Sequence, residues 1–320
     1  SEGRRRTHHD RRSAPGIARV PGLNPLSASL AESGAKAGAA FLADLLQAPS
    51  AEIEADAIIS SEVRADMARV FALSDFAVIT ARRHGDWFLK ALRTGTLENP
   101  FDRSDLVAAA EEVLADVKDL KALQRGLREL RARFQLRVVW RHCLGTATLE
   151  ETTGCSSLLA DVLIDQALTR LYGWLTAERG TPIGAESGKP QQMVIIAMGK
   201  LGACELNLSS DVDLMFCFPE RGSTNDKAVD GSPSRRHGGE LNQQFFVRLG
   251  QQLIQALDPV TEDGFVFRVD MRLRPFGGSG PLALDFSGVE DYYASQGRDW
   301  ERYALMKARP CAGDIDAGLT

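Results

Sequence analysis

A pair of aspartates at the entry to an apolar run constrains this chain more than any other feature. Asp211 and Asp213 come directly before residues 214–218, which read Leu-Met-Phe-Cys-Phe. A short apolar run with polar residues at its border is typical of a buried β-strand, in which successive side chains alternate between the two faces. The sequence therefore predicts a strand from which Asp211 and Asp213 point the same way.

A third aspartate lies in a second segment with strand-like alternation. Over residues 267–274, one set of alternate positions is apolar and the other is charged: Phe267, Val269, Met271 and Leu273 against Arg268, Asp270, Arg272 and Arg274. A neighbouring strand of this kind would bring Asp270 to the first two carboxylates. We predict that Asp211, Asp213 and Asp270 are catalytic and bind Mg²⁺, which prefers oxygen ligands.

Two glycines upstream of the aspartates suit a phosphate. Gly199 and Gly202 follow residues 193–197, which are predicted to form a strand. Glycine accepts positive φ and lets the backbone approach a ligand, so the amides of this loop could bind phosphate oxygens. Paired metal ions can bind both the attacking and the leaving oxygen at phosphorus. Together these elements predict an α+β fold with a polymerase-β-like nucleotidyltransferase sheet.

Arg272 and Arg274 leave two interpretations open. A guanidinium group beside a metal-binding carboxylate can bind anionic oxygens through paired hydrogen bonds. Alternatively, both arginines form ion pairs with the aspartates and orient them. Lys307 and Arg309 likewise either reach a nucleotide phosphate or only cover the sheet.

The rest of the chain divides by composition. Residues 1–25 are rich in arginine and predicted to be a disordered tail, and residues 26–180 a mainly helical domain. Within it we expect a helix capped by Ser104 that runs to about residue 120, and another over about 158–178. Residues 181–288 are the predicted catalytic domain. Residues 289–320 are expected to be helical over 289–309 and to begin a truncated C-terminal region.

Charge and cysteine content narrow the function classes. A net charge of −5 lacks the basic footprint of a nucleic-acid-binding protein. The 5 cysteines include no Cys-x-x-Cys spacing, which favours reduced thiols and a cytoplasmic location. No apolar stretch is long enough for a membrane span.

Several motifs together resemble one known family. They are Gly199-Lys200-Leu201-Gly202, Glu205-Leu206-Asn207, Ser209-Ser210-Asp211-Val212-Asp213-Leu214 and Asp270-Met271-Arg272-Leu273-Arg274-Pro275-Phe276-Gly277. This pattern resembles the bifunctional glutamine synthetase adenylyltransferase/adenylyl-removing enzyme. Residues 296–303, which read Gln-Gly-Arg-Asp-Trp-Glu-Arg-Tyr, resemble its amino-terminal, adenylyl-removing half.

The resemblance implies a reaction and its partners. The family attaches AMP to a tyrosine of glutamine synthetase using ATP and removes it with phosphate, releasing ADP. For this chain it implies removal from adenylylated glutamine synthetase under control of a PII-type signalling protein. The family's metal ligands fall on Asp211, Asp213 and Asp270. Its nucleotide- and phosphate-binding residues fall on the following positions: Gly199, Lys200, Gly202, Ser210, Arg272 and Arg274. Ala203 and Cys204 depart from the family, which often has Gly or Arg there.

Two other functions stay open at this point. The chain could be a catalytically idle module that senses nucleotide or a PII-type protein. It could also be a nucleotidyltransferase with another acceptor. An intact set of three aspartates favours catalysis, because a module that binds only protein needs no paired metal ligands.

Overall fold

A computed structural model describes residues 24–46 and 60–319 of the chain. The arginine-rich tail predicted for residues 1–25 lies almost wholly outside these residues. Seven helices are described before the first strand: α1 (Ala28–Leu46), α3 (Ser61–Leu73), α4 (Asp75–Arg83), α5 (Gly85–Arg93), α6 (Arg103–Val113), α7 (Leu120–Cys143) and α8 (Leu149–Arg179). A mixed sheet with further helices follows, which confirms the predicted α+β class.

The central sheet positions the acidic residues. Its strands are β2 (Val194–Ala197), β3 (Val212–Phe218), β5 (Val269–Asp270), β6 (Ala283–Asp285) and β7 (Arg309–Gly313). The order is β5-β3-β2-β7, and β6 pairs with the far end of β3. β2 is antiparallel to both β3 and β7, whereas β5 and β6 run parallel to β3. A separate antiparallel pair is formed by β1 (Pro182–Gly184) and β4 (Gly222–Thr224).

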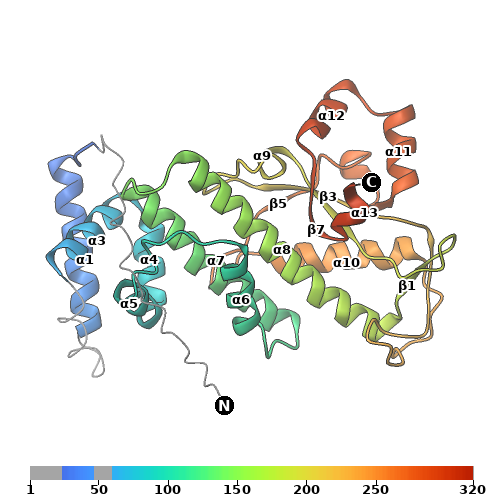
Figure 1. Cartoon of the computed structure of the whole chain (residues 1–320), viewed down its shortest axis with the longest axis horizontal. Helices are drawn as coiled ribbons and strands as arrows, with labels where there is room; N and C mark the ends of the chain where they lie inside the picture. The colour runs from blue at the N-terminus through green and yellow to red at the C-terminus, as the bar shows by residue number, and fades with distance from the viewer. Residues whose placement is uncertain (1–23, 47–59, 320) are drawn as a thin grey trace, which may run out of the picture.

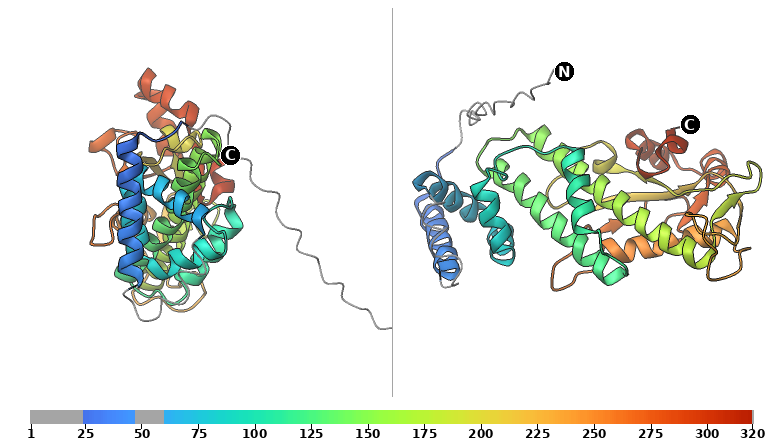
Figure 2. Two further views of the ribbon diagram at one scale, coloured as in Figure 1. Left: turned by 90° about the vertical axis from the view of Figure 1, so that its left-hand side faces the viewer. Right: turned by 60° about the horizontal axis from the view of Figure 1, so that its bottom comes forward.

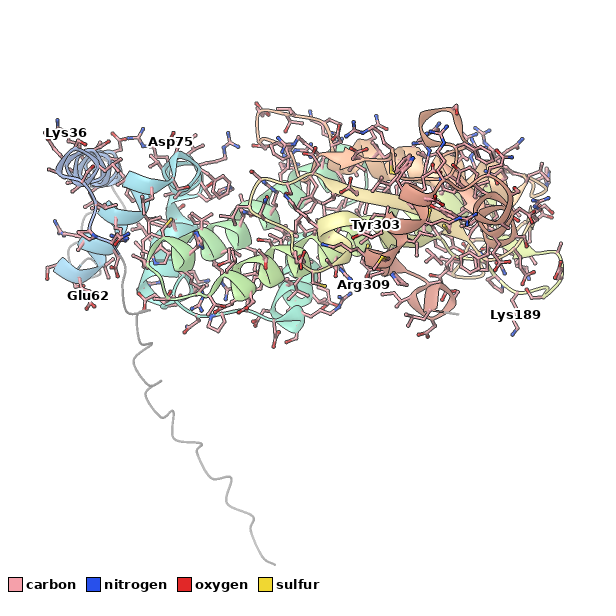
Figure 3. All side chains as sticks on the ribbon, turned by 90° about the horizontal axis from the view of Figure 1, so that it is seen from above. Lys36, Glu62, Asp75, Lys189, Tyr303 and Arg309 are labelled. Carbon is pink, nitrogen blue, oxygen red and sulfur yellow. The ribbon has the colours of Figure 1, made fainter. Side chains whose placement is uncertain are left out.

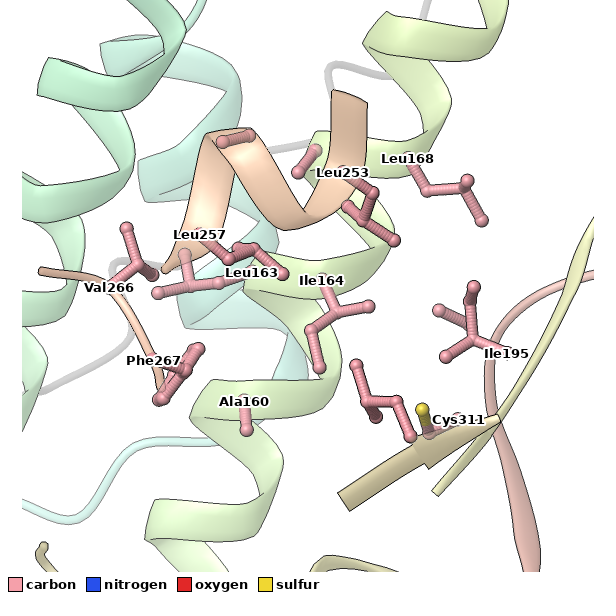
Figure 4. Close-up of a cluster of buried hydrophobic side chains, with 14 of the residues drawn as sticks. Ala160, Leu163, Ile164, Leu168, Ile195, Leu253, Leu257, Val266, Phe267 and Cys311 are labelled. Atoms are coloured by element: carbon pink, nitrogen blue, oxygen red, sulfur yellow. The ribbon is translucent and has the colours of Figure 1, made fainter. Parts of the chain in front are cut away.

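One large core joins the helices to the sheet. The long helices α7 and α8, together with α10 (Asn242–Leu257), bury their apolar side chains against one sheet face. Figure 4 shows part of this core, where Ile164 of α8, Leu253 of α10 and Ile195 of β2 meet. Aliphatic side chains removed from water in this way contribute roughly 1.5–3 kcal/mol each. The predicted helical and catalytic segments thus share a continuous hydrophobic core.

Smaller clusters complete the molecule at its end and on the other sheet face. Helices α1, α3, α4 and α5 pack around Phe88 and Trp140 and form one end of an elongated molecule (Figures 1 and 2). On the second sheet face, Val194, Met215 and Cys217 contact side chains from three further elements. These are α11 (Phe286–Ser295), the 3-10 helix η2 (Leu305–Lys307) and α13 (Ile315–Leu319). Within residues 24–46 and 60–319, the structure contains no helix whose length and hydropathy would suit a membrane span.

Several predicted boundaries are wrong. The helix expected to run from Ser104 to about residue 120 ends at Val113, and its cap is Asp102, which forms a capping box with Asp105. α8 begins at Leu149 rather than near residue 158, because Thr148 caps it there. Capping depends on which side chain reaches the free amides of the first turn, and several polar residues compete for that role.

The strand predictions need two corrections. The alternation over residues 267–274 predicts a long strand, but β5 spans only Val269–Asp270 and a turn follows. The helical prediction over residues 289–309 holds for α11 and for α12 (Asp299–Ala304), but Arg309 begins strand β7. β7 pairs with β2, so this part of the chain belongs to the central sheet.

Candidate active site

Asp213 and Asp270 lie side by side on parallel strands. The register of β3 and β5 pairs Val212 with Val269 and Asp213 with Asp270. Val212 and Leu214 are buried in the large core, so the intervening Asp213 points to the opposite sheet face. Residues paired in register point to the same face, which places the two carboxylates next to each other.

Asp211 immediately precedes β3 and is held by an arginine. Arg268 donates from Nε to Oδ1 of Asp211 over 2.5 Å, and its second terminal nitrogen donates to the carbonyl of Ser209. Both side chains of this ion pair are about half exposed. Arg268 was not among the predicted site residues, although it lies on the charged side of the alternation that includes Asp270.

Asp270 is held by Arg272. The Arg272 guanidinium donates to both carboxylate oxygens of Asp270, with Nε–Oδ2 at 2.8 Å, and the Arg272 amide donates to Oδ1 at 2.8 Å. These hydrogen bonds hold the pKa of Asp270 below its usual range. The Arg272 side chain is 85% exposed, so it can leave the carboxylate without crossing packed structure.

The electrostatics of Asp213 reflect its position between the other two aspartates. Burial raises the pKa of Asp213, and the negative charges of Asp270 and Asp211 raise it further. Arg272 and Lys200 act in the opposite direction. Asp213 therefore lies close enough to each of the other two carboxylates to be repelled by it. A nearby cation would relieve this repulsion.

The three carboxylates do not form a ready-made metal cluster. Across residues 24–46 and 60–319, no group of at least three His, Cys, Asp or Glu side chains is already gathered in the arrangement of a metal site. The physical reason is that Asp211 and Asp270 turn toward Arg268 and Arg272. Within the described part of the chain, Asp213 is the one of the three aspartates that forms no ion pair with an arginine.

Gly199 touches the carboxylate of Asp213. It opens the short helix α9 (Gly199–Gly202) with φ of +55°, and a Cβ there would lie 2.5 Å from Oδ2 of Asp213. The amide of Met198 donates to the carbonyl of Asp213 at 2.9 Å. At Gly202 a side chain would clash with the backbone instead, since a Cβ there would lie 1.9 Å from the carbonyl oxygen of Lys307. The two glycines therefore permit close backbone approach on both sides of α9.

Lys200 and Ser210 meet at the opening of the site. Lys200 donates from Nζ to Oγ of Ser210 at 3.2 Å, and that hydroxyl donates to Oδ1 of Asn207 at 2.6 Å. Lys200 is exposed and Ser210 is half-buried. The Lys200 ammonium and the Ser210 hydroxyl are thus available as donors beside the aspartates. Asn207, which holds the Ser210 hydroxyl, had no predicted role in the site.

Arg274, which was also predicted to belong to the site, contacts backbone carbonyls instead of the aspartates. It donates from Nη1 to the carbonyl of Met271 at 2.7 Å and from Nη2 to that of Gly280 at 3.3 Å. It pairs with neither Asp211 nor Asp270 in the described structure. Its contacts close the turn after β5, which includes Phe276 in the left-handed region at φ of 62°.

Arg309 connects α9 to α8. Its guanidinium donates to both carboxylate oxygens of Asp161, at 2.9 and 3.0 Å, and to the carbonyls of Leu201 and Gly202. Arg309 is the first residue of β7, and Figure 3 labels it near Tyr303 of α12. Lys307 instead pairs with Glu205 at 3.0 Å on the surface. Arg309 thus supports the short helix α9, a role that neither of the two interpretations named.

The glutamate–ammonia ligase adenylyltransferase family matches residues 64–320. A bifunctional glutamine synthetase adenylyltransferase/adenylyl-removing enzyme of Pseudomonas aeruginosa is 45% identical over 301 residues, which is 93% of this chain and 30% of that protein. The enzyme with the same description from Thioalkalivibrio sulfidiphilus is 48% identical over 253 residues, 79% of this chain and 25% of its own length.

These matches cover different shares of the proteins involved. The chain spans between a quarter and a third of the length of the curated relatives described above. The family match, in contrast, extends over most of the chain and includes every predicted site residue. The chain therefore belongs to the glutamate–ammonia ligase adenylyltransferase family.

Proposed function

We propose that this chain is a magnesium-dependent nucleotidyltransferase domain that removes AMP from an adenylylated tyrosine of glutamine synthetase, with phosphate as the acceptor and ADP as the product. The observation that carries the proposal is the register of Asp213 opposite Asp270, with Asp211 next to them and Gly199 against Asp213. The names of the relatives supply the substrate class, since they describe enzymes that add and remove adenylyl groups on glutamine synthetase.

The donor set suits Mg²⁺. Asp211, Asp213 and Asp270 supply only oxygen atoms, and their mutual repulsion contributes to the raised pKa of Asp213. When bound there, divalent metal would neutralise charge on the phosphoryl oxygens and on the attacking and leaving oxygens. For the carboxylates to serve as ligands, Arg268 and Arg272 must release them. The exposure of Arg272 allows that movement.

The released arginines have a second role in this proposal. A guanidinium group freed from a carboxylate can bind phosphate oxygens through the same pair of N–H donors. Arg272 is suited to this because it extends from the turn directly after Asp270. Lys200, Ser210 and the amides at the start of α9 would bind the remaining phosphate oxygens. The site thus orients two anionic groups without requiring a side-chain nucleophile.

In the proposed reaction, one bond to phosphorus forms and one bond to phosphorus breaks. An oxygen of inorganic phosphate attacks the phosphorus of the tyrosine-linked AMP, and the bond from that phosphorus to the phenolic oxygen breaks. The products are ADP and tyrosine, whose phenolate then takes up a proton. A phenol has a pKa of about 10 and leaves more readily than an alkoxide, so activation of the leaving group needs little help.

A specific observation supports a second candidate function. In the described structure, Asp211 and Asp270 are each paired with an arginine. A domain in which these pairs persist would bind no catalytic metal and would serve as a regulatory module for nucleotide or for a PII-type protein. Catalysis requires the pairs to open, whereas regulation through protein contacts alone does not.

One set of assays separates these possibilities. The purified chain is incubated with adenylylated glutamine synthetase, phosphate and Mg²⁺, and ADP release is followed. A parallel reaction contains unmodified glutamine synthetase and ATP, and incorporation of AMP is followed. ADP release without incorporation supports the adenylyl-removing assignment, while incorporation alone assigns the opposite reaction. A folded protein that does neither, and that does not bind Mn²⁺ as a spectroscopic substitute for Mg²⁺, supports the regulatory alternative.

A further inference from the structure

A cavity between α5, α6 and α7 gathers positive charge away from the candidate active site. It has a volume of about 220 Å³, and its polar wall includes Lys90, Arg133 and Arg137. In Figure 1, α5 lies near the blue end of the molecule and α6 lies closer to its middle. Thr94 and Thr96 add hydroxyl groups, and Glu112 is the acidic residue that lines the cavity.

Arg137 is the most informative residue in this cavity. Its exposed fraction is 8%, yet no carboxylate forms an ion pair with it among the described residues. One terminal nitrogen donates to the carbonyls of Asn99 and Pro100, but the buried Nε has no hydrogen-bond partner. Burial lowers the pKa of Arg137, because a charged guanidinium group is less stable away from water. The Arg137 guanidinium lies over the rings of Phe101 and Phe134, with Cζ 4.9 and 5.1 Å from their centroids, which compensates part of the cost of burying its charge. An anion in the cavity would compensate more of it.

The other cations are also positioned for a ligand. Arg133 lies over the ring of Trp87, with its Cζ 5.7 Å from the ring centroid. Its terminal nitrogen pairs with Glu129, but its buried Nε has no partner. Lys90 is exposed at the rim and forms none of the ion pairs described for residues 24–46 and 60–319. Three cations therefore line one cavity, with Glu112 in its wall and Glu129 paired with Arg133.

The cavity is separate from the site of the aspartates. Arg131 and Gln135 of α7 line a much smaller space with Ser209 and Ser210, and Gln135 donates to the carbonyl of Leu208. In contrast, Leu130, Phe134 and Arg137 line the larger cavity. The two spaces thus use different sides of α7.

We propose that the cavity binds a small oxyanion, either a carboxylate or a phosphate, through Lys90, Arg133 and Arg137. The anionic end would lie against the positive charges of these three side chains, and an apolar remainder would contact Ala91, Leu130 and Phe134. The volume limits the ligand to a small molecule. This proposal is independent of the reaction at the aspartates.

Trp87 provides a local probe of binding. The chain has 4 tryptophans, and Trp87 is the one that lines the cavity. The indole N–H signals of protein labelled with ¹⁵N-tryptophan are followed during separate titrations with inorganic phosphate and with malonate. We expect the Trp87 signal to move and saturate with at least one of them while Trp140 stays in place. Saturation by one probe alone assigns the site to that class of anion.

Variants locate the binding. Lys90→Met is expected to weaken binding about fivefold, because one exposed charge contact contributes up to about 1 kcal/mol. Arg133→Met should weaken it further, and Lys118→Met is the control, since Lys118 is exposed and lies outside the cavity. A Trp87 signal that neither anion moves in folded wild-type protein overturns the proposal. Equal affinity in wild type, Lys90→Met and Arg133→Met also overturns it.

Discussion

Asp213 stands directly opposite Asp270 across the parallel pair of β3 and β5, and both point away from the large hydrophobic core. This relationship brings together two carboxylates separated by 56 intervening residues of the chain, numbers 214–269. Because Asp213 is also the one in contact with Gly199, it is the carboxylate on which the proposed chemistry depends most.

Replacement of Asp213 tests the proposed metal site. Asp213→Asn removes a charged oxygen ligand but keeps the side-chain volume, so we expect ADP release to fall by at least about 100-fold with little change in thermal stability. Asp86→Asn is the control, because Asp86 is exposed on α5. Normal turnover in Asp213→Asn would remove this residue from the mechanism.

A pair of glycine replacements tests the packing at α9. Gly199→Ala forces a methyl group against the Asp213 carboxylate at a position with positive φ, so it should reduce both activity and stability, the latter by about 1 kcal/mol. Gly173→Ala lies within α8 with open space around its Cα and should instead stabilise the fold by about 0.5–1 kcal/mol. Urea unfolding and ADP release measure the two effects, and equal behaviour of both variants would contradict the described contact.

Replacement of Arg272 separates binding from turnover. In the described structure Arg272 occupies the oxygens of Asp270 that a metal would use. Arg272→Gln should therefore tighten Mn²⁺ binding about fivefold while lowering the rate of ADP release, because the guanidinium no longer holds phosphate oxygens. Mn²⁺ titration by electron paramagnetic resonance and a kinetic assay provide the readouts. Weaker metal binding in the variant would show that Arg272 does not compete for Asp270.

The Arg309–Asp161 pair should support α9 energetically. Asp161→Asn leaves the partly buried Arg309 guanidinium without its carboxylate, and we expect a loss of about 1.5–3 kcal/mol in the free energy of unfolding. The control is Arg221→Lys, which alters the ion pair between Arg221 and Asp285. The Arg221 side chain is 74% exposed, so this variant should lose less than about 1 kcal/mol in the free energy of unfolding. Denaturant unfolding measures both, and equal losses would argue against a special role for Arg309.

His84, at the junction of α4 and α5, gives a pH prediction. Burial lowers the pKa of His84 below 6.5, and the positive charge of Arg133 adds to this effect. The unfolded chain then binds the proton more readily, so the stability contribution is fully present above pH 6.5 and is lost as pH falls through the lowered pKa. Unfolding free energies from about pH 8 to about pH 5 should fall less steeply in His84→Gln than in wild type. Identical slopes would show that His84 is not the responsible group.

The sequence alone predicted most of the local elements and the residues of the candidate site. The apolar segments located β2 and β3, and the family resemblance agrees with the family that matches residues 64–320. These features are readable because burial of a regular element imposes a period on its own residues. The three aspartates and the two glycines were identified for the same reason, from patterns within short segments.

The tertiary structure decided the rest. Strand β7 has no strand pattern of its own, with Pro310 within it and Gly313 at its end, and it forms because β2 offers an unpaired edge. Tertiary structure also decided that Arg272 pairs with Asp270, while Arg274 closes a turn and Arg309 supports α9. A side chain chooses its partner by distance and geometry in the folded state, and residues far apart in the chain, such as Arg309 and Asp161, carry no local signal of that choice.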